Sequence, residues 1–270
     1  MGIEMFSLKN KTAVITGGTG VLGTEMVKGL AACGANVAVL TRDEKKFDEK
    51  MKGVANVIGV KADIMSRDSL AAAADTIQNK FTKIDILING AGGNQPGATS
   101  SDTNTFFDMP MEAIRDVLHL NFFGGALLSS QVFGKVMKDN EAGTIINISS
   151  MASMRPLTKV LGYGAAKSAV NNFTMWLAVH MAQNYNKKFR VNAIAPGFFL
   201  TEQNRFLLTS KETGELSPRG ASIIGHTPMG RFGESSEVVG ALVWLCSDAA
   251  RFVTGIVLPV DGGFSAFSGV

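Results

Sequence analysis

Three polar residues in the middle of the chain, Ser150, Tyr163 and Lys167, have the types and spacing needed for proton transfer. Tyr163 and Lys167 are four residues apart, so they share one face if the segment is helical. A tyrosine with a pKa of about 10 is a poor acid–base catalyst at neutral pH, but a neighbouring ammonium stabilises the phenolate and lowers that pKa. Tyr163 could then protonate a carbonyl oxygen, or deprotonate an alcohol, while a hydride moves. A Tyr-x-x-x-Lys pair also arises often by chance, so the prediction depends on what surrounds it.

A glycine cluster near the start of the chain indicates where a nucleotide would bind. Gly18, Gly20 and Gly23 match the spacing G-x-G-x-x-G directly after an apolar run. In this pattern the glycines allow a tight turn, close approach of a pyrophosphate and close packing of a helix on a strand, and free N–H groups at the helix start face the anion. The alternative is a glycine-rich turn without a ligand. We predict dinucleotide binding, and the turn residues expected to contact the cofactor are Gly17, Thr19, Gly20, Val21 and Leu22.

The residues after the second apolar run bear on the choice of nucleotide. An acidic residue about 20 positions past the glycines would hold the ribose 2′-hydroxyl of NAD. Thr41 occupies that place and Arg42 follows it. A cation there suits a 2′-phosphate, so we predict NADP as the preferred cofactor and NAD as the alternative. Arg42 could instead be a solvated side chain that pairs with Asp43 or Glu44.

Positioning these residues requires strands that alternate with helices. Short, nearly continuous apolar runs predict strands buried on both faces, at Thr12–Thr16, Asn36–Leu40, Val54–Val60, Ile84–Ile88, Gly143–Ile148, Phe189–Ala195 and Ile256–Val260. Longer segments predict helices at Gly23–Ala32, Asp68–Phe81, Met111–Val136, Tyr163–Gln183 and Glu237–Ser247. The alternation favours an α/β fold, a doubly wound (Rossmann-type) parallel sheet of about seven strands with helices on both faces. An eight-stranded barrel competes, but the strand number and the early glycine cluster disfavour it.

Composition and charge exclude several classes of protein. The chain has 270 residues, of which 46% are hydrophobic and 18% charged, so it is not disordered. A net charge of +3 gives no electrostatic case for nucleic acid or an anionic membrane. Cys33 and Cys246 form neither a disulfide framework nor a metal site, and the three histidines lack metal-ligand spacing. No secretory or membrane-spanning segment is present. We expect a cytoplasmic protein without metal, nucleic acid or membrane partners.

Six motifs occur together in one order. They are T-G-G-T-G-V-L-G at Thr16–Gly23, Asp63-Ile64, N-G-A-G at Asn89–Gly92, Leu120-Asn121, S-x(12)-Y-x(3)-K at Ser150–Lys167, and P-G-F-F-L-T at Pro196–Thr201. With this order and spacing the chain resembles the short-chain dehydrogenase/reductase family along essentially its whole length. The resemblance implies a single NAD(P)-binding domain over residues 1–270, an NAD(P)-dependent oxidoreductase acting on CH–OH groups, and a homotetramer.

The resemblance also implies a role for individual residues. Tyr163 would be the proton donor, Lys167 would lower its pKa and bind the nicotinamide ribose, and Ser150 would hold the substrate oxygen. Asn121 would anchor a water in the proton relay. The implied cofactor contacts are Asp63 and Ile64 near the adenine, Asn89, Gly90 and Ala91 along the cofactor, and Pro196, Gly197 and Thr201 at the nicotinamide end.

Two positions depart from the family pattern. Val21 stands where members of this length usually have glycine, so the pyrophosphate turn is expected to differ in detail. Gly90 replaces the second Asn of N-N-A-G, so any side-chain hydrogen bond at that position is lost.

The substrate is the least determined feature. The segment 202–231 is where the family builds a substrate lid, and polar residues near the pocket would suit a hydroxylated anion, with arginine binding a carboxylate. The candidates are Asn94, Arg155, Gln203 and Arg205. Several segments are similar to the group of this family that acts on sugar acids (D-mannonate oxidoreductase, or fructuronate reductase, and gluconate dehydrogenases), so we predict a fructuronate/mannonate-like substrate. The alternatives are reduction of another carbonyl, such as a 3-oxoacyl thioester, and a non-catalytic cofactor-sensing protein.

Overall fold

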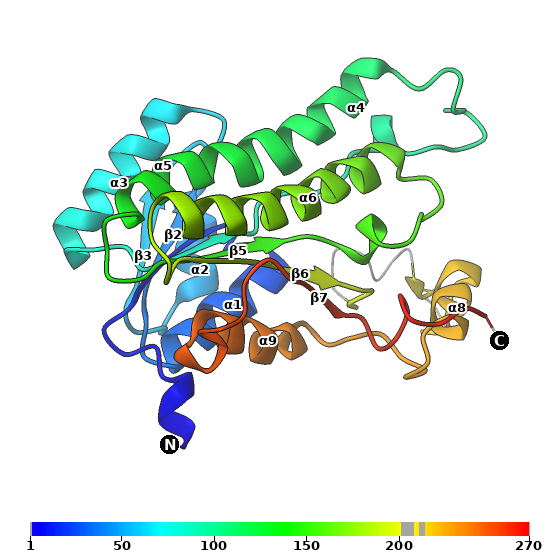
Figure 1. The fold of residues 1–270 in the computed structure, drawn as a ribbon. Helices are drawn as coiled ribbons and strands as arrows, with labels where there is room; N and C mark the ends of the chain where they lie inside the picture. Colours follow the sequence, from blue (N-terminus) through cyan, green and yellow to red (C-terminus); the bar gives the residue numbers. More distant parts are fainter. Residues whose placement is uncertain (1, 201–207, 211–213, 270) are drawn as a thin grey trace.

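Seven parallel strands form one open sheet in the computed structural model, which describes residues 2–200, 208–210 and 214–269 (Figure 1). The strands are β1 (Thr12–Thr16), β2 (Asn36–Thr41), β3 (Val57–Lys61), β4 (Ile86–Asn89), β5 (Thr144–Ile148), β6 (Arg190–Pro196) and β7 (Val257–Val260). Their order is β3-β2-β1-β4-β5-β6-β7, and every neighbouring pair is parallel. The predicted doubly wound sheet is therefore confirmed, and the barrel is excluded because β3 and β7 are edges.

Helices cover both faces of this sheet, as Figure 1 shows. The longer ones are α1 (Val21–Ala32), α2 (Glu44–Met51), α3 (Arg67–Phe81), α4 (Met111–Leu118), α5 (Ser129–Met137), α6 (Leu161–Asn184), α8 (Pro218–Gly225) and α9 (Val238–Cys246). Helices α3, α5 and α6 pack on one face, and α1 and α9 pack on the other. Within the described residues, no helix combines the length and hydrophobicity needed to span a lipid bilayer.

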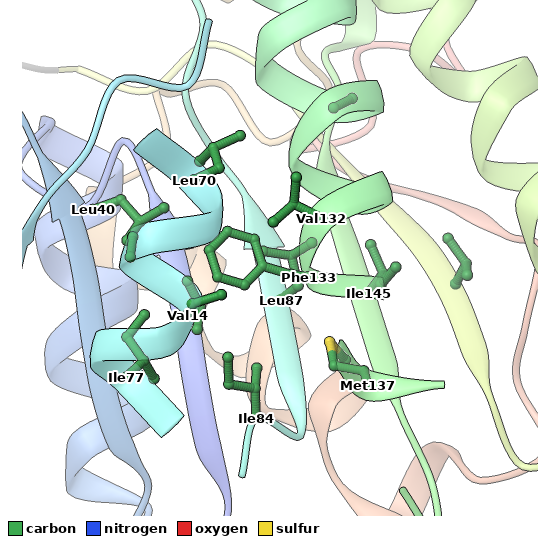
Figure 2. Close-up of a cluster of buried hydrophobic side chains, with 14 of the residues drawn as sticks. Val14, Leu40, Leu70, Ile77, Ile84, Leu87, Val132, Phe133, Met137 and Ile145 are labelled. Atoms are coloured by element: carbon green, nitrogen blue, oxygen red, sulfur yellow. The ribbon is translucent and has the colours of Figure 1, made fainter. Parts of the chain in front are cut away.

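The core consists of two apolar layers, because successive side chains of a strand point to opposite faces. Val14 lies in the layer with α3, α5 and α6, whereas Ala13 and Ile15 lie in the layer with α1 and α9. Figure 2 shows the first layer, where the ring of Phe133 lies beside Leu87 and is fully buried. Because both faces are covered, most strand residues are apolar, which is the pattern that predicted the strands.

The strand order reverses between β1 and β4. From β1 the chain builds outward through β2 to β3, and then crosses back to place β4 against the other side of β1. In such sheets ligands bind outside the carboxyl ends of the strands at this reversal. Thr16 and Asn89 are paired there as the last residues of their strands, so the glycine cluster after β1 faces the loop after β4.

The sequence located most elements, but among the α-helices whose bounds are given above it missed α2 and α8. Helix α2 is only eight residues long and strongly charged, and its apolar face consists of Phe47 and Met51 alone, which is too little to reveal it. It begins where the Asp43 carboxylate accepts a hydrogen bond from the Lys46 amide. Helix α8 was also missed, although Ser217 and Pro218 form a typical helix start.

The helix predicted over Met111–Val136 extends to Met137, but it is not uniform. Between α4 and α5 the backbone follows a π-helical course over His119–Leu128. π-Helical turns cost hydrogen-bond quality and occur frequently at functional sites. This one contains Asn121, a residue singled out from the sequence.

Candidate active site

A cavity of about 220 Å³ lies at the carboxyl edge of the sheet, beside the strand-order reversal. Residues from five separate segments line it, namely Ile15, Leu22, Gly23, Met26, Gly90, Gly92, Ile148, Ser149, Ser150, Tyr163, Lys167, Pro196 and Gly197. The structure thus brings together the glycine turn, the loop after β4, the end of β5, the start of α6 and the end of β6. These segments carry most of the residues predicted for catalysis and for cofactor binding.

The turn after β1 is shaped so that side chains cannot fill it. Gly17 has a φ of 71°, and a Cβ there would lie 2.6 Å from the Gly90 carbonyl oxygen. A Cβ on Gly23 would lie 2.1 Å from the Gly17 oxygen, whereas one on Gly20 would lie 3.3 Å from it. Close backbone approach therefore requires glycine at positions 17 and 23.

Helix α1 starts at Val21 directly after this turn. Gly20 is its N-cap, no side chain caps it, and no acidic residue lies in its first turn. The first N–H groups of such a helix lack partners within the helix, and the helix dipole favours an anion beside them. The glycine turn and the start of α1 together fit a nucleotide pyrophosphate. Val21 needs no positive φ as the first helical residue, so its departure from glycine is accommodated.

Thr16, which the sequence reasoning did not single out, holds the loop after β4 against the turn. Its hydroxyl oxygen accepts hydrogen bonds from the amides of Gly90 and Ala91, both 3.0 Å long. A Cβ on Gly90 would lie 2.7 Å from the Thr16 carbonyl oxygen, so glycine suits this position. A threonine that ends a strand just before a glycine cluster was the available signal.

Asn89 lies deeper than the cavity. Its side chain is buried and donates hydrogen bonds to Asn147 (2.8 Å) and Ser130 (2.9 Å), which ties β4 to β5 and α5. Its side chain does not line the cavity, so any contact that Asn89 makes to a cofactor would come from its backbone.

The predicted proton-transfer residues meet inside the cavity. The Lys167 ammonium is buried, donates a hydrogen bond to the Ile148 carbonyl at 2.7 Å, and lies 5.6 Å from the centre of the Tyr163 ring. The Ser150 hydroxyl oxygen accepts a hydrogen bond from the Ala152 amide at 3.1 Å. The single proton of that hydroxyl is thereby left to donate toward the cavity.

Burial dominates the acid–base properties of this group. Desolvation lowers the pKa of Lys167 to about 8. Desolvation also raises the pKa of Tyr163, while a hydrogen bond with Ser150 acts in the opposite direction. The predicted lowering of the Tyr163 pKa is therefore not found, because loss of hydration outweighs the stabilisation of the phenolate. The phenol is protonated at neutral pH, which suits a proton donor.

Asn121 holds in place the loop after β4, which lines the cavity. Its amide nitrogen donates to the carbonyls of Gly93 (2.7 Å) and Val117 (2.8 Å), and its oxygen accepts from the Gly93 amide. A Cβ on Gly92 would lie 2.4 Å from the Asn121 amide oxygen and 3.2 Å from the Lys167 nitrogen. Gly92, which the sequence reasoning used only as part of a motif, thus lets Asn121 and Lys167 approach each other. Both amide hydrogens of Asn121 are occupied by the protein itself.

The residues predicted near the adenosine lie at the ends of β2 and β3. Arg42 is exposed and has no ion pair among the residues that the structure describes. Asp43 does not pair with it, because its carboxylate caps α2. Asp63 accepts a hydrogen bond from the Met65 amide, and Ile64 follows it in the same turn. Arg42 is therefore available to an anionic ligand.

The substrate candidates are only partly described. Asn94 is exposed and its amide donates to the Thr99 hydroxyl at 2.8 Å. Arg155 donates through Nε to the Ser265 carbonyl at 2.9 Å, which ties it to the C-terminal segment. Thr201, Gln203 and Arg205 lie outside the described residues, as does part of the predicted lid.

An aromatic cluster between β6, α8 and the C-terminal segment was not predicted. Phe264 contacts Phe198 with ring centres 5.1 Å apart, and its ring centre is 6.5 Å from that of His226. This cluster joins the C-terminal segment to the residue that follows Gly197 and to the end of α8, so it borders the described part of the predicted lid.

A nucleotide site formed by a glycine turn, beside a half-buried tyrosine and a buried lysine and serine, defines an NAD(P)-dependent oxidoreductase. Comparison with known proteins identifies the family within this class. Residues 19–265 match a family model described as enoyl-(acyl carrier protein) reductase. The chain belongs to the short-chain dehydrogenase/reductase family.

Three similar proteins cover nearly the whole chain. An uncharacterized oxidoreductase of Bacillus subtilis is 46% identical, over 98% of both chains. A crystal structure from Haemophilus influenzae with bound NAD, provisionally called a D-mannonate oxidoreductase, is 42% identical over 98% of both chains with a TM-score of 0.90. The 2-dehydro-3-deoxy-D-gluconate 5-dehydrogenase of Pseudoalteromonas atlantica is 33% identical over 97% of this chain and 98% of that protein.

Proposed function

We propose that this enzyme catalyses reversible hydride transfer between a nicotinamide cofactor and the carbonyl or alcohol group of a sugar acid, of the fructuronate/mannonate type. The observation that carries the proposal is the 42% identity, over 98% of both chains, with the protein called a D-mannonate oxidoreductase. The likeness to a dehydrogenase of another sugar acid supports the same substrate class. Arg155, the one described arginine among the substrate candidates, would bind the substrate carboxylate.

The proposed chemistry assigns one task to each residue of the cavity. Bound NAD(P)H supplies the hydride. Ser150 donates a hydrogen bond to the substrate oxygen and keeps its proton, because its own oxygen already accepts from Ala152 and its hydroxyl is next to Tyr163. Tyr163 gives its phenolic proton to the same oxygen, which completes the alcohol, and takes it back when the alcohol is oxidised. Lys167 holds positive charge next to the phenolate that this transfer leaves.

A substrate panel tests this function. We expect the purified protein to oxidise NADH or NADPH with D-fructuronate at least about tenfold faster, by kcat/KM, than with an acetoacetyl thioester. The thioester represents the alternative raised by the sequence, reduction of a 3-oxoacyl thioester. Absorbance of the reduced cofactor gives the rates, and Tyr163→Phe controls for contaminating activity. Rapid turnover of the thioester with inert fructuronate would contradict the sugar-acid proposal. Cofactor binding without turnover of any panel member would favour the sensor alternative.

We further propose NADP as the preferred cofactor, supported by the exposed Arg42, which forms no ion pair within the part of the chain that the structure describes. Arg42→Ala should weaken NADPH binding about tenfold, the order expected for one charge-assisted hydrogen bond, and leave NADH binding nearly unchanged. Quenching of protein fluorescence by each reduced cofactor measures the two dissociation constants. Arg251→Ala is the matched control, because Arg251 is an exposed arginine beside the opposite ends of β5 and β6. An unchanged ratio of the two constants in Arg42→Ala would refute the assignment.

A further inference from the structure

Helix α6 carries a third polar residue on the face that bears Tyr163 and Lys167. Asn171 lies four residues after Lys167 and eight after Tyr163, so all three lie along one side of the helix. Tyr163 and Lys167 line the cavity, but Asn171 does not. Its amide instead contacts Ser149 and Ser153, which flank Ser150. The roles proposed above use neither of these serines nor Asn171.

The contacts of Asn171 form a directed chain of hydrogen bonds that ends at the backbone of Ser150. The Ser149 hydroxyl donates to the Asn171 amide oxygen at 2.5 Å. The Asn171 amide nitrogen donates to the Ser153 hydroxyl oxygen at 2.8 Å. The Ser153 hydroxyl donates to the Ser150 carbonyl at 2.5 Å. The Ser149 hydroxyl also lies 3.1 Å from the Ser153 hydroxyl and 3.4 Å from the Lys167 carbonyl oxygen. Because the Ser153 hydroxyl donates to Ser150, its oxygen accepts from the Asn171 nitrogen, and this sets the orientation of the amide.

Several hydrogen bonds tie α6 to the segment that carries Ser150. Besides the chain through Asn171, Lys167 donates to the Ile148 carbonyl, the Ser149 hydroxyl lies 3.4 Å from the Lys167 carbonyl oxygen, and the Ser168 hydroxyl lies 3.5 Å from the Ser153 carbonyl oxygen. The chain through Asn171 and the bond from Lys167 hold the segment on either side of Ser150, through Ser153 after it and Ile148 before it. The Ser150 hydroxyl is also held by the Ala152 amide, within the short helical turn η4 (Met151–Ser153). The placement of Ser150 relative to Tyr163 therefore depends on how this turn sits on α6.

We propose that Asn171 is a positioning residue that acts through Ser153 to hold the Ser150 hydroxyl against Tyr163. This inference rests on the proposed roles of Ser150 and Tyr163, and not on the identity of the substrate. Ser149 and Ser153 belong to the same device, since each contributes one bond of the chain.

The tyrosine content of the chain allows a test that needs no substrate. Tyr163 and Tyr185 are the two tyrosines of the sequence, so in a Tyr185→Phe background the ultraviolet absorbance of tyrosinate reports Tyr163 directly. The hydrogen bond from Ser150 favours the ionised phenol, so a displaced Ser150 should make Tyr163 titrate at higher pH. We expect that shift in Asn171→Ala and in Ser153→Ala. Asn172→Ala, its exposed neighbour on the helix, is the control and should show none.

A double-mutant cycle separates positioning from general stabilisation of the helix. In a Ser150→Ala background, Asn171→Ala should cause no further shift, because the hydroxyl through which it acts is gone. Two results would overturn the proposal. One is that Asn171→Ala shifts the titration of Tyr163 equally with and without Ser150. The other is that neither Asn171→Ala nor Ser153→Ala shifts that titration. Circular dichroism over the same pH range restricts the comparison to folded protein.

Kinetics provide a second measurement where the panel yields a substrate. Asn171→Ala should lower kcat about tenfold, as expected for a slightly misplaced catalytic hydroxyl, and leave KM for the cofactor unchanged. In the Ser150→Ala background Asn171→Ala should not lower kcat further. A further loss of kcat in that background would overturn the proposal. If no sugar acid is turned over, the proposed function fails, while the titration still decides the role of Asn171.

Discussion

Tyr163→Phe is expected to lower kcat by about 10²–10⁴-fold, the range that general acid–base catalysis contributes. Phenylalanine keeps the ring and its packing at the start of α6 and removes only the hydroxyl that would exchange a proton with the substrate. The affinity for the cofactor should change by no more than about twofold, because the nucleotide cradle is formed by other segments. Steady-state rates and a direct cofactor titration measure the two quantities.

Tyr185→Phe is the matched control for this prediction. Tyr185 is 56% exposed at the far end of α6, and it lies outside the cavity. Its replacement should leave kcat unchanged. Equal turnover by Tyr163→Phe and the wild type would remove Tyr163 from the mechanism and favour a cofactor-sensing protein.

Lys167→Met should cost turnover about 10²-fold or more, since the variant lacks the positive charge beside the phenol. It should also change how stability depends on pH. Burial lowers the pKa of Lys167 from 10.5 to about 8, so the folded state binds its proton less tightly than the unfolded state does. Below pH 8 the charged lysine destabilises the wild type, and above pH 10.5 it is neutral in both states, so that the penalty disappears.

The wild type should therefore gain stability relative to Lys167→Met as the pH rises from 8 to 10.5. The expected gain is about 3 kcal/mol, the free energy that corresponds to the difference between the two pKa values. Urea unfolding of both proteins at several pH values measures it, and the comparison cancels the titration of Cys246, which both proteins keep; making it in a Tyr163→Phe background removes the titration of Tyr163. Lys135→Met, at an exposed lysine of α5, should show no such trend relative to the wild type. A pH-independent difference between the wild type and Lys167→Met would show that Lys167 is not desolvated.

The sequence predicted the elements that are buried on both sides and the motifs that sit at their ends. The strand Thr12–Thr16 was predicted with its observed bounds, because its apolar residues face two separate layers of the core. The juxtaposition of Ser150, Tyr163 and Lys167 was also predictable, since one ends a strand and the others share a helix face. Helix α2 escaped prediction because its stability depends on a cap and on local charge.

Features that depend on exact side-chain geometry could not be predicted. The pKa of Tyr163 was expected to fall, but the degree of its burial decides the direction, and burial is set by the whole fold. Asn89 was expected among the cofactor contacts, whereas its side chain joins a polar cluster beneath the cavity. Nor could spacing show that Asn171 contacts two serines that precede it by about 20 residues.

The contact between the ends of β1 and β4 affects how the chain folds. The hydrogen bond from the Gly90 amide to Thr16 joins residues 74 positions apart, with three strands and three helices between them. Contacts so distant along the chain form slowly, because a long loop must close before they contribute. The nucleotide cleft exists only after this closure, so added cofactor should slow unfolding and leave the refolding rate unchanged.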